Sequence, residues 1–284
     1  MAMTDTRRDP STSEPGPKEA VRRMWGLGDY PKVSREVLGE MGDRLVTSCG
    51  IGPGQRVLDV AAGSGNVAIR AARTGAEVVA SDLTPALLAA GKQEAEKQGV
   101  ELEWVEADAE ALPFTDGEFD VVTSAVGAMF APDQRATAAE MLRVLKPGGV
   151  LGMANWTPDG SVAKFFAMVG NYGPPPPEGF EPPVLWGSPG HVEDLLGDGT
   201  EEISMTKESL DWNFDDPVDL REYYKEHFGP VMTVYEDLGD DQERIAALDR
   251  DFLDYALSAN LAPEGEAARY ELDYLVVLAR RSSR

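Results

Sequence analysis

Between residues 55 and 156 short apolar runs alternate with helix-like segments, and this alternation constrains the fold more than any other feature of the chain. The apolar runs lie at residues 56–60, 77–81, 102–105, 120–124 and 150–156. Strands joined by helices of about a dozen residues require right-handed crossovers and a parallel sheet. The pattern therefore predicts an α/β domain with a doubly wound sheet and helices on both faces.

The first of these runs leads into a glycine-rich turn, with the sequence RVLDVAAGSGN over residues 56–66. Its apolar part predicts a strand buried on both faces, and Gly63 and Gly65 let a ligand approach the backbone. Residues 66–73 predict a helix whose N-terminal amides face the turn. A strand, a glycine turn and a helix in this order are typical of a site for a nucleotide-like ligand.

The flanking segments have different compositions. Residues 1–17 are rich in Thr, Ser, Pro and charge, so we expect a disordered tail there. Residues 18–50 show helical spacing and predict an N-terminal helical cap of two or three short helices. The remainder, 51–284, forms the main domain, in which the proline-rich stretch 157–200 predicts an irregular lid or insertion after the fifth strand. Further along, the patterns predict strands at 201–212 and 270–279 and helices at 217–227 and 242–258.

Charge and composition narrow the classes of partner. The chain has 50 acidic and 26 basic residues and a formal net charge of −24, which disfavours nucleic acid and anionic membrane surfaces. No apolar run is long enough to span a membrane, and no secretion signal is visible, so we expect a cytoplasmic protein with a small-molecule partner. Cys49 is the single cysteine, and His191 and His227 are the two histidines, so we expect no metal site.

Acidic residues follow the next two predicted strands. Asp82 ends the second strand and could accept both hydroxyls of a ribose, although capping of the following helix is an alternative role. Asp108 ends the third and could accept the amino group of an adenine, although an ordinary solvated loop would look the same. Since the residues from Gly63 to Ala68 also fit a dinucleotide-binding pattern, the glycine turn alone does not decide the ligand.

Taken together, these motifs resemble those of class I S-adenosylmethionine-dependent methyltransferases, and the branch is similar to the ubiquinone and menaquinone biosynthesis C-methyltransferases and their small-molecule relatives. The matching segments are VLDVAAGSGN at 57–66, DLT at 82–84, DAEALPF at 108–114, FDVV at 119–122 and LKPGG at 145–149. The resemblance implies a Rossmann-like sheet of seven mostly parallel strands, with the last strand antiparallel. It also implies S-adenosyl-L-methionine as the cofactor.

The resemblance further implies roles for particular residues. In the family, matches to Asp59, Ala61 and residues 63–65 surround the methionine part of the cofactor. The match to Asp82 holds the ribose, and matches to Asp108 and Ala109 hold the adenine. Ala61 departs from the glycine that many members carry. The cofactor-binding set that we predict is Tyr30, Asp59, Ala61, Gly63, Ser64, Gly65, Asn66, Asp82, Leu83, Asp108, Ala109 and Ser124.

We predict that the acceptor meets the cofactor near Met129, Phe130, Asn155 and Trp156, with Trp25 as a further candidate wall residue. Aromatic side chains within 161–196, among them Phe165, Phe166, Phe180 and Trp186, favour a hydrophobic or aromatic acceptor. His227 and His191 are weak candidates for a general base, and we assign no catalytic residue.

The leading hypothesis is thus methyl transfer to a carbon or oxygen of a small hydrophobic or aromatic metabolite, mainly through positioning and desolvation. An NAD(P)-dependent oxidoreductase and a catalytically silent cofactor-binding scaffold remain the alternatives. The carboxylate of Asp59 suits a sulfonium better than a pyrophosphate, which favours the first hypothesis. The sequence leaves a homodimer open as the assembly.

Overall fold

A computed structural model describes residues 17–283, and its centre is one sheet of seven strands in the order β3-β2-β1-β4-β5-β7-β6. The first five strands are mutually parallel, and β7 is antiparallel to both of its neighbours. The predicted doubly wound, mostly parallel sheet with an antiparallel last strand is therefore confirmed. The strands are β1 (Arg56–Val60), β2 (Glu77–Asp82), β3 (Glu103–Glu106), β4 (Phe119–Ala125), β5 (Leu145–Trp156), β6 (Thr200–Phe214) and β7 (Ala268–Arg281).

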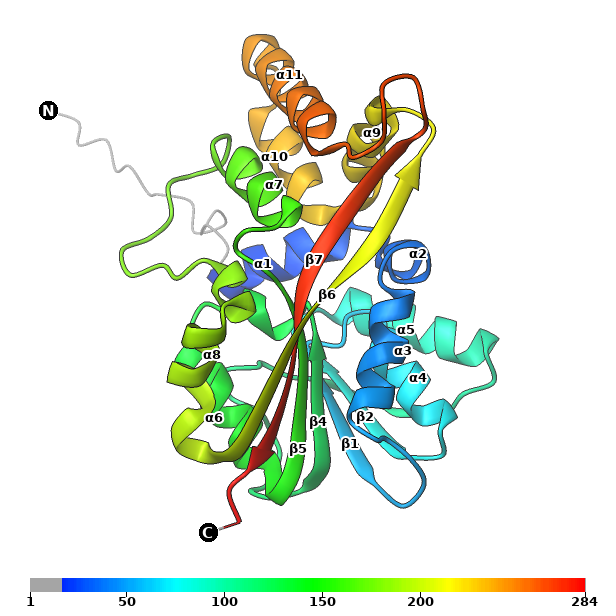
Figure 1. Cartoon of the computed structure of the whole chain (residues 1–284), viewed down its shortest axis with the longest axis vertical. Coiled ribbons are helices and arrows are strands. Elements are labelled where there is room, and N and C mark those ends of the chain that lie inside the picture. Colours follow the sequence, from blue (N-terminus) through cyan, green and yellow to red (C-terminus); the bar gives the residue numbers. More distant parts are fainter. Residues whose placement is uncertain (1–16, 284) are drawn as a thin grey trace, which may run out of the picture.

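Helices cover both faces of this sheet, with α3, α4 and α5 on one side and α6 and α8 on the other (Figure 1). Their bounds are α3 (Gly39–Ser48), α4 (Asn66–Arg73), α5 (Pro85–Lys97), α6 (Gln134–Val144) and α8 (Pro189–Leu196). Helix α3 packs closely on β5, because a Cβ at Gly152 would lie 2.1 Å from Cys49 Sγ. Burial in this contact raises the pKa of the Cys49 thiol to about 12, as expected for an inert core residue.

The remaining helices gather over the carboxyl ends of the parallel strands, and we call them the roof (Figure 1). They are α1 (Pro17–Leu27), α2 (Tyr30–Glu36), α7 (Ser161–Gly170), α9 (Pro217–His227), α10 (Gly229–Leu238) and α11 (Gln242–Ala259). Three short 3₁₀ turns complete the described chain, η1 (Ala128–Phe130), η2 (Pro183–Gly187) and η3 (Gly197–Gly199).

Three of the six roof helices, α9, α10 and α11, are connected to strands β6 and β7. The two strands pair along their whole length, from Thr200 with Arg281 to Phe214 with Ala268. Only residues 274–280 of β7 also pair with β5, so the far part of the two strands projects beyond the sheet as a ribbon. Helices α9, α10 and α11 lie between the two strands in the sequence and therefore form an insertion at the end of this ribbon (Figure 1).

Segments from both ends of the sequence hold the roof together. The Asp29 amide donates to the His227 carbonyl at 3.1 Å, and the Gly229 amide donates to the Tyr30 hydroxyl at 3.3 Å. A Cβ at Gly229 would lie 2.0 Å from the Met24 carbonyl oxygen, so only glycine allows this approach of α10 to α1. The N-terminal helices and the β6–β7 insertion thus form one packed unit.

The structure differs from the sequence-based expectation in several elements. Stretch 157–200 is less irregular than expected, since it contains α7 and α8, and its longest part without helix or strand is residues 171–182. Strand β5 begins at Leu145 instead of residue 150, because Leu145 pairs with Phe119 before the register shifts. Helix α10 was not predicted. The expected disordered tail lies, except for Pro17, outside the described residues.

Candidate active site

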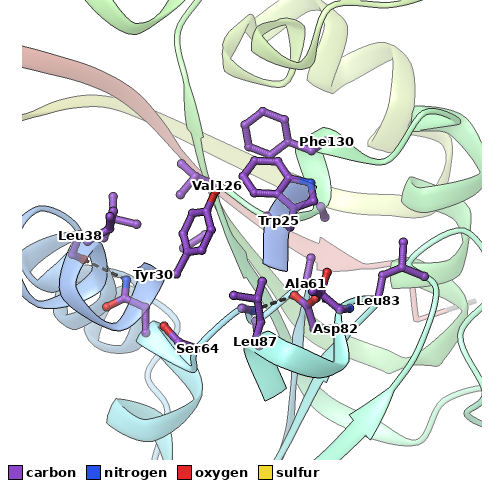
Figure 2. A pocket seen from close by; sticks show the side chains of 18 of the residues that line it. Trp25, Tyr30, Leu38, Ala61, Ser64, Asp82, Leu83, Leu87, Val126 and Phe130 are labelled. Atoms are coloured by element: carbon purple, nitrogen blue, oxygen red, sulfur yellow. Dashed lines mark hydrogen bonds between the residues drawn. The ribbon is translucent and has the colours of Figure 1, made fainter. Parts of the chain in front are cut away.

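A cavity of about 460 Å³ lies between the carboxyl ends of β1, β2 and β4 and the roof. Figure 2 shows its interior, with Trp25 and Phe130 facing each other above Asp82 and Leu83, and with Tyr30 and Leu38 to one side. One end of the cavity is formed by the glycine turn and the loops that follow β2 and β3. The other end is formed by aromatic side chains. The two ends therefore offer different chemistry.

Two strained residues shape the floor of the cavity. Ala61 after β1 has φ of 52°, and Val126 after β4 has φ of 44°, values that are unfavourable for any side chain and most of all for a β-branched one. Gly127 packs onto Ala61, since a Cβ there would lie 2.2 Å from the Ala61 carbonyl oxygen. Strained backbone of this kind is concentrated at functional sites. The loops after β1 and β4 are thus pressed together where both line the cavity.

Asp82 ties the glycine turn to the end of β2. One carboxylate oxygen accepts from the Gly63 amide at 2.8 Å, and the other accepts from the Thr84 amide at 2.8 Å. Burial raises the pKa of this carboxyl above its ordinary value, while the two amides oppose that shift. Thr84 occupies the N-cap position of α5 without a side-chain capping bond. Because a carboxylate has about four lone-pair sites, Asp82 keeps acceptor capacity toward the cavity that it lines.

Asp59 lies beneath the floor and is 1% exposed. Its carboxylate accepts from the Ala68 amide in the first turn of α4 at 3.0 Å and from the Thr123 hydroxyl at 2.9 Å. Burial raises its pKa to about 7, although these two hydrogen bonds favour the charged form. Asp59 therefore orients the helix behind the glycine turn and does not line the cavity.

Acidic side chains also surround the loop after β3. Asp108 and Glu110 both bind the ammonium of Lys18, with the Glu110 contact at 3.0 Å. On the same face of α1, Arg22 donates to the Leu83 carbonyl at 3.0 Å and pairs with Glu106 at 2.7 Å. Helix α1 is thereby fixed across the ends of β2 and β3.

Ten aromatic side chains line the cavity. All of them except Trp156 form one continuous group of rings, which we call the aromatic shell, with contacts such as Trp25 with Phe130 at 4.8 Å between centroids and Phe165 with Tyr224 at 4.2 Å. Such rings offer large apolar area with little conformational freedom. The aromatic shell consists of Trp25, Tyr30, Phe130, Phe165, Phe166, Trp212, Tyr223, Tyr224 and Phe228.

Comparison with known proteins agrees with this geometry. Residues 57–149, which carry the glycine turn and the strand-end loops, match the family model described as a methyltransferase domain. A demethylmenaquinone methyltransferase of Thermus thermophilus is 43% identical over 106 residues, which cover 37% of this chain and 48% of the relative. The chain belongs to the class I S-adenosylmethionine-dependent methyltransferases.

The similarity of this methyltransferase to other proteins extends beyond that domain. An uncharacterized protein of Mycobacterium tuberculosis, Rv1405c, is 42% identical over 92% of this chain and 93% of its own length. The YcgJ protein of Bacillus subtilis has a similar fold, with a TM-score of 0.59 and 19% identity over 86% of this chain and 99% of that one. The sequence similarity thus extends over most of the chain, and the solved structure shows the same fold.

Most of the residues predicted to bind the cofactor lie around one end of the methyltransferase's cavity. Three others do not line it. Asp59 lies beneath the floor, Gly65 packs against the Trp104 ring, and the Ser124 hydroxyl accepts from the Ala128 amide. The predicted residues that line the cavity are Tyr30, Ala61, Gly63, Ser64, Asn66, Asp82, Leu83, Asp108 and Ala109.

The predicted acceptor-side residues divide in the same way. Phe130 and Trp156 line the cavity, whereas Met129 and Asn155 are 0% exposed and lie behind its wall. Successive side chains of a strand point to opposite faces of the sheet, which explains why Trp156 reaches the cavity and Asn155 does not. Within the lid segment, Phe165 and Phe166 belong to the aromatic shell, whereas Phe180 is 49% exposed.

Neither histidine faces the cavity. Nε2 of His227 lies 2.8 Å from the Lys32 ammonium and so accepts a hydrogen bond from it, because an ammonium can only donate. Nε2 of His191 on α8 lies 2.7 Å from Oε1 of Gln134 on α6. Both rings are thus held by other side chains.

The contribution of the β6–β7 insertion to the cavity was not predicted from the sequence. Tyr223, Tyr224 and Phe228 come from α9 and the turn after it, more than 90 residues beyond Phe130 in the chain. The available signal was a group of aromatic residues in an otherwise highly charged helix, which is unusual for a helix that only faces solvent.

Proposed function

We propose that this methyltransferase transfers a methyl group from S-adenosylmethionine to a small hydrophobic or aromatic acceptor, at carbon or oxygen. The observation that carries the proposal is the continuity of one cavity from the glycine turn to the aromatic shell. A donor at one end and an apolar acceptor at the other would lie in the same enclosed space. Enclosure of two reactants in this way supplies alignment and removes water.

The residues at the glycine end fit the cofactor. A Cβ at Gly63 would have no atom within 4 Å, so the turn leaves open space beside its backbone. Asp82 and Asp108 both line this end of the cavity, and in this proposal Asp82 accepts from ribose hydroxyls and Asp108 accepts from the adenine amino group. Ala61 and Ser64 would border the methionine part. When bound, the cofactor supplies an activated methyl group on a sulfonium sulfur.

The aromatic shell has three tasks in this proposal. Its rings bury apolar acceptor surface, exclude water from the reacting atoms, and hold the acceptor at a fixed distance from the methyl group. Aromatic faces also favour a nearby positive charge such as a sulfonium. The charged side chains that line the cavity, Lys18, Asp82, Asp108 and Glu110, all belong to the glycine end among residues 17–283.

We propose no histidine base for this reaction, in keeping with the hydrogen bonds that hold His227 to Lys32 and His191 to Gln134. Proton removal, where the acceptor requires it, is then left to the acceptor's own acidity near the sulfonium or to water. The contribution of the protein is mainly alignment and desolvation. His227→Gln should accordingly retain the turnover of the wild type.

Calorimetry tests the donor half of the proposal. We expect S-adenosylhomocysteine to bind with micromolar or better affinity, Asp82→Ala to weaken that binding at least tenfold, and NAD not to bind. Binding of NAD without binding of the sulfur nucleotide would overturn the proposal in favour of an oxidoreductase.

A labelled-methyl assay with a panel of phenols, quinols and other apolar acceptors tests the acceptor half. Phe228→Ala should reduce transfer to any acceptor found while leaving the affinity for S-adenosylhomocysteine within a factor of about two, because Phe228 lies at the aromatic end. Transfer only to charged, polar acceptors would contradict the apolar acceptor class.

A further inference from the structure

The ammonium of Lys18 binds Asp108 and Glu110, the acidic side chains beside which the proposed function places the adenine. Lys18 lies in the first turn of α1 and lines the cavity, and its Nζ binds Oδ2 of Asp108 and, at 3.0 Å, Oε2 of Glu110. The hydrogen bond to Asp108 is the largest cause of a raised Lys18 pKa, so the side chain is fully charged at neutral pH.

Both carboxylates also accept a hydrogen bond from a backbone amide. Oδ1 of Asp108 accepts from the Glu110 amide at 3.0 Å, and Oε1 of Glu110 accepts from the Asp133 amide at 2.8 Å. Since a carboxylate has about four lone-pair sites, an adenine amino group that donates to Asp108 either shares an oxygen with Lys18 or the Glu110 amide, or displaces the ammonium. A charged donor forms the stronger hydrogen bond, so the lysine competes effectively.

We propose that Lys18 is a built-in competitor of the adenine amino group for Asp108 and thereby sets the affinity of the enzyme for its cofactor and for the nucleoside product. This inference rests on the proposed function, because it assumes that the adenine lies at Asp108. A lysine in this role weakens nucleoside binding and favours release of the product after transfer.

Helix α1 does not need to leave its place for this exchange. Arg22, one turn further along, holds the Leu83 carbonyl at 3.0 Å and Glu106 at 2.7 Å, independently of Asp108. The side chain of Lys18 is 52% exposed and has solvent beside it into which it can swing. The competition is thus between two donors for one carboxylate, with the backbone unchanged.

The exposure of Lys18 also limits the size of the effect. Half-exposed ion pairs are weak, so removal of the lysine should strengthen nucleoside binding about two- to fivefold and no more. The pair should also be sensitive to salt, because the Debye length falls from about 10 Å to about 3 Å between 0.1 M and 1 M salt.

Calorimetry with two ligands tests the proposal. The first is S-adenosylhomocysteine, and the second is S-inosylhomocysteine, in which an oxygen replaces the amino group. Lys18→Met should bind the adenosine ligand two- to fivefold more tightly than the wild type and should not bind the inosine ligand more tightly, because the oxygen of inosine is an acceptor and does not compete with the lysine for Asp108. Lys18→Arg should restore the wild-type affinity for both, because arginine retains the charged donor.

Lys207→Met is a matched control. Lys207 on β6 also bridges two carboxylates, Asp159 at 3.2 Å and Asp273 at 3.0 Å, and it is 49% exposed, but it does not line the cavity. This variant should bind both ligands as the wild type does. Raising salt should strengthen adenosine-ligand binding in the wild type and in Lys207→Met, and leave Lys18→Met unchanged.

Several outcomes would overturn the proposal. If Lys18→Met binds S-adenosylhomocysteine equally or more weakly, Lys18 does not compete with it. If both ligands bind more tightly by the same factor, the lysine acts by closing α1 and not through the amino group. If the wild type binds neither ligand, the proposed function itself fails, whereas wild-type binding without an effect of Lys18 refutes this inference alone.

Discussion

At the scale of single residues, two positions in the floor of the cavity adopt backbone conformations that reduce the free energy of unfolding. Ala61 and Val126 hold backbone angles that a side chain disfavours, and both line the cavity. Ala61 replaces a glycine that many members of the family carry, but the sequence alone does not show that the position has a positive φ. In the fold, Gly127 of the loop after β4 packs against Ala61 in this conformation.

Ala61→Gly should therefore stabilise the protein by about 1 kcal/mol, because glycine adopts a positive φ without the steric cost that alanine incurs. Urea denaturation measures the change. Ala62→Gly is the control, since Ala62 has no positive φ and should lose about 0.5–1 kcal/mol through the added freedom of the unfolded chain. Equal destabilisation of both variants would contradict the assignment of strain to Ala61.

The buried carboxyl of Asp59 gives a second prediction at this scale, on pH. Its pKa is raised to about 7 in the folded protein from an ordinary value of 3.8, so the folded state holds a proton that the unfolded state has released. The stability that this proton contributes is complete below the unfolded value and is lost as pH rises through about 7. Wild type should gain stability relative to Asp59→Asn as pH falls from about 8 to about 5.

Urea denaturation at several pH values checks this prediction. Asp82 has a pKa shift in the same direction and stays in both proteins, so the comparison reports Asp59 together with the repulsion between Asp59 and Asp82. A difference in unfolding free energy that does not change with pH would show that Asp59 ionises in the folded protein as readily as in the unfolded chain.

At the scale of secondary-structure elements, the parallel strands and the loops after them were predictable, whereas the roof was only partly so. Buried apolar runs such as 57–60 and the signals around Pro85 mark elements by local chemistry alone. The helices α9 and α11 were also visible in the sequence. Their position over the site was not, because it depends on the long β6–β7 ribbon and on a contact between residues about 200 positions apart.

Gly229→Ala tests that contact. The new Cβ would lie 2.0 Å from the Met24 carbonyl oxygen, so α1 and α10 must separate, and we expect a loss of about 1–3 kcal/mol. Gly190→Ala in α8 is the matched control, since nothing lies within 4 Å of its Cβ and alanine favours a helix by up to about 1 kcal/mol. Urea denaturation compares the two, and equal stability would mean that the roof is not closely packed at Gly229.

At the scale of the whole molecule, the excess of acidic side chains affects stability. The net charge is −24, and the like charges repel one another more strongly in the compact folded state than in the unfolded chain. Raising salt from about 0.1 M to about 1 M should therefore raise the urea midpoint, because screening of this repulsion outweighs the loss of weak surface ion pairs. A lower midpoint at high salt would show that the ion pairs dominate.

Charge and hydropathy in the sequence disfavour a membrane partner. None of the helices within residues 17–283 combines the length and apolar character needed to cross a bilayer. The shape of the aromatic end of the cavity could not be deduced from the sequence, because the aromatic shell draws on elements far apart in the chain and becomes a surface only after folding.

The strand order has a consequence for the timing of folding. Strand β7 lies between β5 and β6, although it is the last of the seven to be synthesised. Until residues 268–281 have left the ribosome, β6 has no strand to pair with, and the α9–α11 insertion is attached only to this unpaired strand. Helices α1 and α2 are synthesised first, but they can contact α9 and α10 only after those helices have been synthesised. A newly made chain therefore completes the parallel part of its sheet early and the aromatic end of its cavity last.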